Sequence, residues 1–223
     1  MATKYSPKTV TNGLVLSLDA ANNKSYPRSG TTWTDLSGNS NTGTLTNSPT
    51  FSGANGGSIV FDGVDDYVGC IGSLTVTAAT FITWIRRNGS QVEYSGILFS
   101  RGTSITGMNF FGGTNRLGYH WNASTSTYLW DSGLTVPDLT WCMIAVSVTS
   151  TSSTAYLCQI GITSATNVVS HASTVLDSIR IAADSQSPRF FKGNIAAAQI
   201  YNRALTDAEI LQNYNATKSR FGL

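Results

Sequence analysis

Apolar and polar residues alternate along about ten short segments of the chain. In residues 13–20, for example, Leu14, Leu16 and Leu18 fall on one face of an extended backbone. This period of two predicts β-strands that bury one face, and the intervals between them are typical of antiparallel sheets. The other segments of this kind are 58–62, 67–70, 80–87, 96–100, 116–122, 127–131, 141–148, 154–160, 178–182 and 193–201.

This number of strands is too large for one open sheet, which would curl or split. We therefore predict an all-β fold in which two antiparallel sheets pack face to face. One short helix is predicted at the C-terminal end, over residues 206–218. Thr206 and Glu209 have the spacing of a capping box, and Ile210, Leu211 and Tyr214 form an apolar face.

The alternation is lost between residues 21 and 57, where Gly, Asn, Ser and Pro are frequent. These residue types favour turns, and we expect this segment to be a long surface loop. Residues 1–12 include Pro7 and have no apolar periodicity, so they are assigned to an N-terminal arm, and 13–223 to a single domain. The arm could dock on a neighbouring subunit or could be a frayed terminus.

Charged residues make up only 12% of the chain, and the formal net charge is +2. Basic residues are scattered from Lys4 to Arg220, so no positive stripe could follow a nucleic acid or an anionic membrane. No apolar run approaches the length of a membrane span, and the first residues lack the pattern of an export signal. We therefore expect no nucleic-acid binding, no membrane insertion and no export.

The chain has three cysteines, an odd number. Cys142 and Cys158 fall on two strands that read as a hairpin turning at residues 149–154. With the turn centred there, Cys142 lies opposite a residue near 161 and Cys158 opposite one near 145. Because the two cysteines do not face each other, we expect buried, reduced thiols rather than a disulfide.

A catalytic carboxylate pair is difficult to find in this sequence. There are only two glutamates, Glu93 and Glu209, and Glu209 is assigned to the helix cap. A glycosidase on a two-sheet scaffold needs two carboxylates that face each other across a cleft, and no strand presents such a pair. His120 and His171 have no Ser or Cys nucleophile in a recognisable setting. The sequence therefore indicates a protein that is not an enzyme. A glycanase is the least favoured candidate function.

Three aspartates, Asp62, Asp65 and Asp66, lie within five positions of a chain that has few acids. Together with Asp35 and Asn39 they could supply the oxygen ligands of a calcium ion, although the spacing matches no EF-hand loop. The alternative is a turn in which Asp62 ends a strand, Gly63 takes a positive φ, and Asp65 or Asp66 binds backbone amides. Both interpretations remain open.

Aromatic residues gather in residues 119–130, which read as a second hairpin. Tyr119 and Trp121 would share one face of its first strand, and Tyr128 and Trp130 one face of its second. Exposed rings of this kind could stack on sugars, whereas buried ones would be large members of the core. These four residues are the candidate ligand-binding residues.

The order of several motifs resembles the laminin-G-like branch of the concanavalin A-like lectin/glucanase superfamily. The motifs are the segments 13–20, 33–45, 56–68, 81–85 and 191–210, and the resemblance extends from Gly13 to Asn215. It implies a jelly-roll sandwich of two curved antiparallel sheets, a fold that serves sugar binding, protein interaction and glycan hydrolysis. Many relatives have Gly-x-Ile-Asp-Glu-Val before the terminal helix, where residues 193–198 here have alanine in place of both acids.

Residues 5–39 also resemble a variant found in structural proteins of tailed phages. This resemblance implies a capsid decoration protein on the head surface, assembled in the host cytoplasm and exposed on the virion. Its partners would be capsid or other virion proteins, a host-surface glycan and, in a homo-oligomer, further copies of the chain. The alternative is a calcium-dependent carbohydrate-binding module or tail adhesin.

Overall fold

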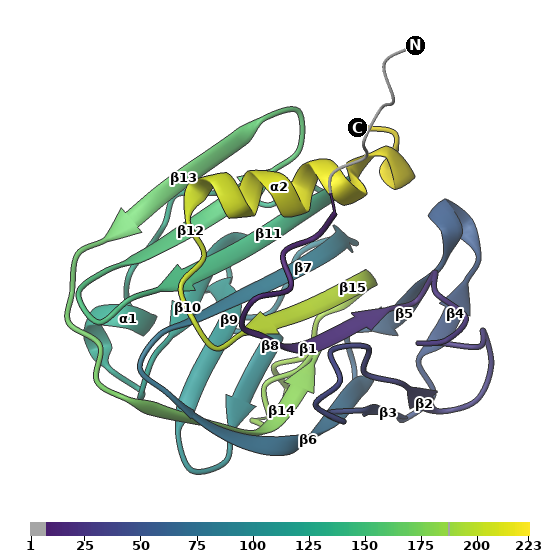
Figure 1. Cartoon of the computed structure of the whole chain (residues 1–223), viewed down its shortest axis with the longest axis horizontal. Helices are drawn as coiled ribbons and strands as arrows, with labels where there is room; N and C mark the ends of the chain where they lie inside the picture. The colour runs from purple at the N-terminus through teal and green to yellow at the C-terminus, as the bar shows by residue number, and fades with distance from the viewer. Residues whose placement is uncertain (1–7, 187) are drawn as a thin grey trace.

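The computed structural model describes residues 8–186 and 188–223, and these form two packed antiparallel sheets (Figure 1). The eight-stranded sheet has the order β13-β12-β11-β7-β15-β5-β4, and β1 pairs with β15. Its strands are β1 (Leu14–Asp19), β4 (Thr50–Ser52), β5 (Ser58–Asp62), β7 (Ala79–Arg87), β11 (Trp141–Val148), β12 (Ser153–Cys158), β13 (Ile162–Asn167) and β15 (Lys192–Tyr201).

The seven-stranded sheet has the order β10-β9-β8-β14-β6-β3-β2. Its strands are β2 (Thr32–Trp33), β3 (Gly43–Thr46), β6 (Tyr67–Val76), β8 (Gly96–Arg101), β9 (Ile105–Phe111), β10 (Arg116–His120) and β14 (Thr174–Ile181). The helical elements are α1 (Thr125–Tyr128), α2 (Asp207–Thr217) and two 3₁₀ turns, η1 (Ala54–Gly56) and η2 (Lys218–Phe221). The predicted all-β jelly-roll sandwich with a short C-terminal helix is confirmed.

The main core lies between the two sheets because alternate side chains of each strand point inward. On β7, Phe81 and Ile85 join this core, whereas Ile82 and Trp84 belong to a second apolar cluster on the outer face of the eight-stranded sheet. Strands β11 and β15 contribute to both clusters in the same way. The central strands are therefore buried on both faces.

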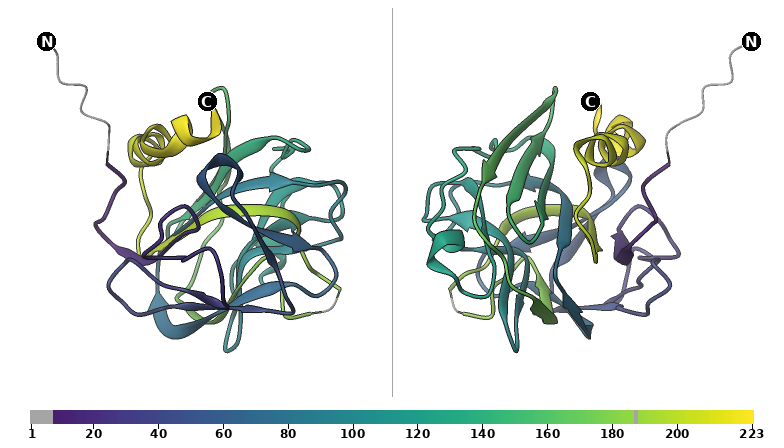
Figure 2. Two further views of the ribbon diagram at one scale, coloured as in Figure 1. Left: turned by 90° about the vertical axis from the view of Figure 1, so that its right-hand side faces the viewer. Right: turned by 60° about the vertical axis from the view of Figure 1, so that its left-hand side comes forward.

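Helix α2 and turn η2 cover the outer face of the eight-stranded sheet (Figures 1 and 2). The ring of Trp84 stacks on Phe221 at a centroid distance of 4.1 Å and on Tyr214 at 5.8 Å. Its indole Nε1 donates a hydrogen bond to the Thr217 hydroxyl at 2.8 Å. The outer cluster is thus a small third layer of the sandwich. In the described residues, no helix is long and apolar enough to cross a membrane.

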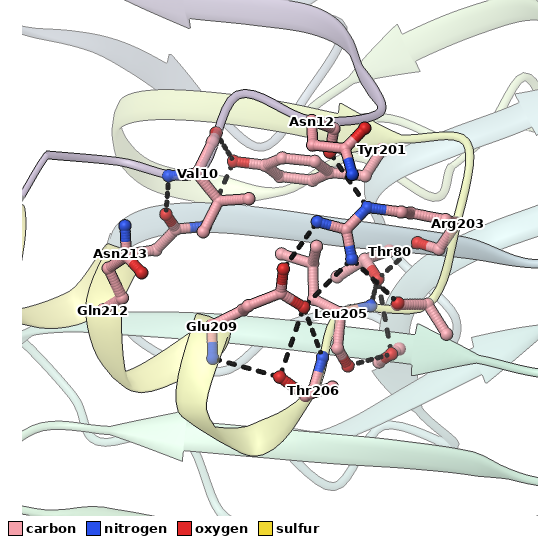
Figure 3. A network of polar contacts seen from close by, with 12 residues as sticks. Val10, Asn12, Thr80, Tyr201, Arg203, Leu205, Thr206, Glu209, Gln212 and Asn213 are labelled. Carbon is pink, nitrogen blue, oxygen red and sulfur yellow. Dashed lines mark hydrogen bonds and ion pairs between the residues drawn. The ribbon is translucent and has the colours of Figure 1, made fainter.

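Polar contacts fix the start of α2 (Figure 3). The capping box is confirmed: Thr206 accepts a hydrogen bond from the Glu209 amide, and the Glu209 carboxylate accepts one from the Thr206 amide. Arg203 also pairs with Glu209, with Nη2 and Oε1 at 2.6 Å. This guanidinium, together with the Thr206 amide, lowers the pKa of Glu209 to about 2.

Residues 8–12 of the predicted arm bind to the chain's own domain (Figure 3). The Val10 amide donates to Asn213 Oδ1 at 2.7 Å, and the Tyr201 hydroxyl donates to the Val10 carbonyl at 2.9 Å. The Asn12 carbonyl accepts from Arg203 Nε at 3.0 Å. This part of the arm is packed rather than frayed, and residues 1–7 lie outside the described residues.

The prediction that 21–57 is a surface loop is wrong in part. The segment contains β2, β3 and β4, and the side chain of Trp33 is fully buried in the core, with Tyr26 3% exposed beside it. These strands are two to four residues long. They are too short to show a period of two among so many turn residues.

The predicted hairpin at 119–130 is also wrong. Residues 116–120 form β10, but the segment 127–131 is not a strand, because the chain closes into the single helical turn α1. The Thr127 hydroxyl accepts from the Trp121 amide at 3.0 Å and donates to the Ser124 carbonyl at 2.7 Å. These local bonds satisfy backbone groups that a second strand would need.

The three cysteines are free and buried, as predicted. Cys142 points into the core between the sheets and Cys158 into the outer cluster, so the two lie on opposite faces of the sheet. The hairpin register differs from the prediction, because Cys158 pairs with Met143 rather than with residue 145. Burial raises the pKa of Cys70 and Cys158 to about 12, which keeps both thiols protonated.

Candidate functional site

A pocket of about 250 Å³ lies on the outer face of the seven-stranded sheet. Tyr119 on β10 points into the core, so its neighbour His120 points outward into the pocket. Strand β8, the start of β9, turn α1 and two loops supply the other walls. The lining residues are Tyr94, Arg101, Ile105, His120, Ala123, Tyr128, Gln186 and Arg189.

Three aromatic rings form one wall of the pocket. Tyr128 stacks on His120 with centroids 5.3 Å apart and an interplanar angle of 17°. Tyr94 meets both rings edge-on, at 5.6 Å from His120 and 6.3 Å from Tyr128. The two tyrosines are half-buried. They therefore present an apolar ring surface and a polar hydroxyl edge to a ligand.

The backbone beside these rings has an unusual conformation. Tyr94 has a φ of 54° and Ala123 a φ of 53°, both in the left-handed region that costs a residue with a side chain about 1–2 kcal/mol. The residue with this backbone conformation, Tyr94, is also the one whose ring contacts both His120 and Tyr128. Such residues persist only where their surroundings hold them, and they concentrate at functional sites.

A buried carboxylate fixes two arginines that line the same pocket. Asp184 is fully buried and accepts hydrogen bonds from Arg101, with Nη2 and Oδ2 at 2.6 Å, and from Arg189 Nη1 at 3.1 Å. The Arg189 guanidinium also lies over the Tyr94 ring, 5.0 Å from its centroid. Both arginine side chains remain about one-fifth exposed, at 21% and 23%. They are therefore held in place and can still donate to a ligand.

The imidazole of His120 is neutral at neutral pH. Burial, against the opposing charge of Asp184 and with smaller contributions from Arg101 and Arg189, lowers its pKa to about 4. Asn109 Nδ2 donates to the Phe110 carbonyl, so Asn109 Oδ1 is an acceptor, and it lies 3.2 Å from His120 Nδ1. The proton is thus on Nδ1, which leaves Nε2 as a hydrogen-bond acceptor.

The structure separates the four aromatic residues that were predicted to bind a ligand. Tyr128 lines the pocket. Tyr119 and Trp121 are 2% and 1% exposed in the core, where they have no free ring face for a sugar. Trp130 is half-buried and packs edge-on against Tyr119 at 5.8 Å. The burial follows from the inward orientation of Tyr119 on β10 and from the turn that replaces the predicted second strand.

Sequence reasoning missed most of the pocket. The missed residues come from two distant segments, Tyr94 with Arg101 and Asp184 with Arg189, and none belongs to a motif. The sequence around His120 shows no nucleophile partner and gives no signal of a binding role. Tyr94 follows the sequence Gln-Val-Glu in a loop, with no local signal of its role.

The aspartates of the β5–β6 turn do meet, and each can offer one oxygen within 4.8 Å of the others. The turn predicted as the alternative is also present. Asp62 Oδ1 accepts from the Val64 amide at 2.8 Å, Asp66 Oδ2 accepts from the Asp62 amide at 3.1 Å, and Gly63 has a φ of 79°. Burial, followed by the charges of Asp62 and Asp65, raises the pKa of Asp66.

This donor set fits calcium. Carboxylate oxygens remain after the turn's own hydrogen bonds are made, and a cation would offset the repulsion among the three carboxylates, which adds to burial in raising the pKa of Asp66. The aspartates do not line the pocket. An ion held there would stabilise the turn without touching a ligand of the pocket.

Asp35 and Asn39 lie outside this acidic group. They cover the edge of β1 instead: Asp35 Oδ1 accepts from the Ser17 amide at 2.8 Å, and Asn39 Nδ2 donates to the Leu14 carbonyl at 3.2 Å. The other oxygen of Asp35 accepts from the Ser37 hydroxyl and the Asn41 amide. Both carboxylate oxygens of Asp35 are therefore engaged in holding the 35–41 loop.

The alanines that replace the acids of the related motif lie on β15. Ala196 is fully buried in the outer cluster beneath α2 and η2, and Ala197 packs at the edge of the same cluster. An ionised carboxylate at position 196 would have to be desolvated against apolar side chains. Alanine at this position suits the apolar packing.

Comparison with known families is consistent with this geometry. The family described as the concanavalin A-like lectin/glucanases superfamily, of laminin-G type, matches residues 61–211. The chain belongs to this family. The match includes β5 to β15 in part or whole and the first part of α2, and therefore the whole described lining of the pocket. No curated protein sequence matches the chain.

Several solved structures share the fold of this laminin-G-like domain. Domain 4 of an extracellular arabinanase from Geobacillus stearothermophilus, in complex with arabinotriose, has a TM-score of 0.68 and 17% identity over 91% of this chain and 98% of that chain. A Trypanosoma rangeli sialidase in complex with sialic acid has a TM-score of 0.62 and 14% identity over 93% of this chain. This chain spans 33% of that sialidase.

The binding domain of a paraclostridial mosquitocidal protein is a further neighbour. Its TM-score is 0.60, with 14% identity over 94% of this chain and 53% of that chain. At these identities the likeness establishes the fold, which is lectin-like, and leaves the ligand to be inferred from the pocket itself.

We expect the stability of the fold to decrease as the pH falls below 6.5, because folded His120 resists protonation. An unperturbed His has a pKa of 6.5 and folded His120 one of about 4, so below pH 6.5 the unfolded chain binds a proton that the folded chain does not. The unfolding free energy should fall by about 2–3 kcal/mol between pH 7 and pH 4.5. The His120→Phe variant keeps a ring in the cluster. Its unfolding free energy, measured by urea titration, should fall less over this pH range. Equal losses in the two proteins would contradict this assignment.

We expect calcium to raise the melting temperature through the β5–β6 turn. At a calcium concentration of 100 times Kd, a single site would add about 2.7 kcal/mol to the unfolding free energy, and EDTA would remove this gain. Asp65→Asn should abolish the gain and leave the melting temperature in EDTA unchanged, because the exposed Asp65 carboxylate makes no hydrogen bond within the described chain. An unchanged midpoint in the parent protein would argue that the aspartates serve the turn alone.

Proposed function

We propose that this laminin-G-like domain is a non-enzymatic carbohydrate-binding module whose ligand enters the pocket at Tyr94, His120 and Tyr128. The observation that carries the proposal is the pairing of half-exposed tyrosine rings with two fixed arginines around one cavity. Aromatic rings can pack against the C–H face of a sugar, while the arginines and His120 Nε2 can bond its hydroxyls.

The size of the pocket favours the end of a glycan. Its volume of about 250 Å³ is below the roughly 300–1,000 Å³ of pockets that enclose a drug-sized ligand. One or two sugar units would fill it. The rest of the glycan would extend into solvent.

The acids near the pocket support a binding role rather than hydrolysis. Glycoside hydrolysis ordinarily needs two carboxylates on either side of the scissile bond. Among the described lining residues none is a carboxylate, and Asp184 behind them is fully buried and bonded to both arginines. The solved arabinanase domain, which is in complex with arabinotriose, lends further support to a binding role.

We expect Tyr128→Ala to weaken glycan binding by about 2 kcal/mol, or roughly 30-fold in Kd, because it removes a stacking face. Tyr128→Phe should retain most of the affinity. Tyr67→Ala is the matched control, because Tyr67 is also half-buried but lies on β6 outside the pocket, under Arg180. Ligands would be found on a glycan array and measured by calorimetry. A chain that binds no glycan would refute the proposal, and unchanged binding by Tyr128→Ala would remove the site from this pocket.

We also propose that the module acts on the surface of a phage particle, as a capsid decoration protein. The phage-like character of residues 5–39 supports this setting. The fold is compatible with it, since α2 and residues 8–12 lie on one outer face of the sandwich and the pocket on the other. One face could therefore contact a capsid while the other meets a host glycan.

We expect the protein to co-sediment with purified phage heads, and tail preparations provide the comparison that separates a decoration protein from a tail adhesin. Binding to heads should survive Tyr128→Ala, because that residue lies on the face away from α2. Failure to sediment with any virion part would refute the virion setting and leave the carbohydrate-binding proposal intact.

A further inference from the structure

Strand β13 forms one edge of the eight-stranded sheet (Figure 1). Its residues 162–167 pair with β12 in a regular antiparallel register, from Ser153 opposite Asn167 to Cys158 opposite Ile162. In the described part of the chain, no strand or loop makes backbone hydrogen bonds to its other side. Half of its backbone donors and acceptors are thus available to a further strand.

The other sheet edges are short or covered. Strands β4 and β2 have three and two residues. The edge of β10 is covered by residues 134–136, with the Leu117 amide bonded to the Leu134 carbonyl at 2.9 Å. The 35–41 loop covers β1, as described above. Among the described strands, β13 is therefore the edge best suited to accept a partner.

Nothing in the sequence of β13 protects this edge. Natural edge strands carry lysines, prolines or bulges that prevent pairing with another chain. Residues 139–176, from β11 to the middle of β14, contain no Asp, Glu, Lys or Arg. The strand itself has no proline and pairs without a bulge.

The two most exposed large hydrophobic side chains of the described residues flank β13. Ile160, just before the strand, is 95% exposed, and Val168, just after it, is 80% exposed. Ile162, at the start of the strand, is 37% exposed. Isolated apolar residues on a surface are normal, but these three line one edge of the sheet.

We propose that two copies of this chain associate by antiparallel pairing of their β13 strands about a two-fold axis at Ser164. In such pairing, opposite residues lie on the same face of the sheet, so their numbers have an even sum. An axis at Ser164 places Ile162 opposite Thr166 of the second copy. Because of the two-fold symmetry, Ile160 of each copy then lies beside Val168 of the other copy.

This register accounts for both exposed aliphatic residues at once, which is the reason for choosing a second copy as the partner. An uncharged strand also meets its own copy without like-charge repulsion. The pairing would join the two eight-stranded sheets into one continuous sheet. Neither pocket is lined by β13, so the dimer would display two glycan sites.

Introducing a charge at the two-fold axis tests the proposal. Ser164 is exposed, so neither Ser164→Lys nor Ser164→Glu should alter the fold, which circular dichroism and thermal melting would verify. Sedimentation velocity of the parent protein should show a species of twice 23.7 kDa that grows with concentration. Each variant alone should be monomeric because like charges meet at the axis, and an equimolar mixture of the two should recover the dimer.

Thr75→Lys is the control, because Thr75 is an exposed residue of β6 in the other sheet, where it pairs with Val175 of β14, and it should leave the dimer intact. A parent protein that stays monomeric up to ~1 mM would overturn the proposal. A dimer that persists in both Ser164 variants would also overturn it, since the contact would then lie elsewhere. If β13 paired with another virion protein but not with a second copy of this chain, the proposed dimer would be wrong and that protein would be the partner.

Discussion

The burial of β7, β11 and β15 on both faces is the constraint on which the rest of the structure depends. Their inward side chains form the core between the sheets, and their outward side chains, such as Trp84, need a second cover. Helix α2 and η2 supply that cover, and the capping box together with Arg203 sets where the helix begins. Because this layer occupies one outer face of the sandwich, the open outer face belongs to the seven-stranded sheet, where the pocket lies.

The sequence predicts strands such as β8 and β11 well because their own side chains decide them, whereas β9 lies outside the predicted segments. The apolar run over 141–148 coincides with β11, and α2 begins at its predicted cap. Strands β2, β3 and β4 are only two to four residues long and are held by pairing with β3, β6 and β5, so no repeat within them marks them. Strand β13 was missed because Thr, Ser and Ala give no apolar repeat on an exposed edge.

The candidate site was less predictable than the fold. Tyr128 is among the four aromatic residues predicted from the sequence. The residues that line the pocket with it come from loops and strands that lie up to about half of the chain apart. Whether a ring faces the core or the pocket depends on which side of its strand it lies, as Tyr119 and His120 show by pointing to opposite sides of β10. The buried Asp184 that orders both arginines has no sequence signal, since an isolated aspartate in a loop usually caps a turn.

The contacts of residues 8–12 with α2 have a consequence for how the chain folds during synthesis. Val10 bonds to Asn213, and β1 pairs with the end of β15, so segments about two hundred residues apart complete the same sheet and its outer layer. Loops of this length close slowly, and folds rich in such distant contacts fold slowly. During synthesis β7 and β11 must therefore exist before β15, which pairs with β7, and before α2 and η2, which cover both strands, and at that stage their apolar outer faces are open to aggregation.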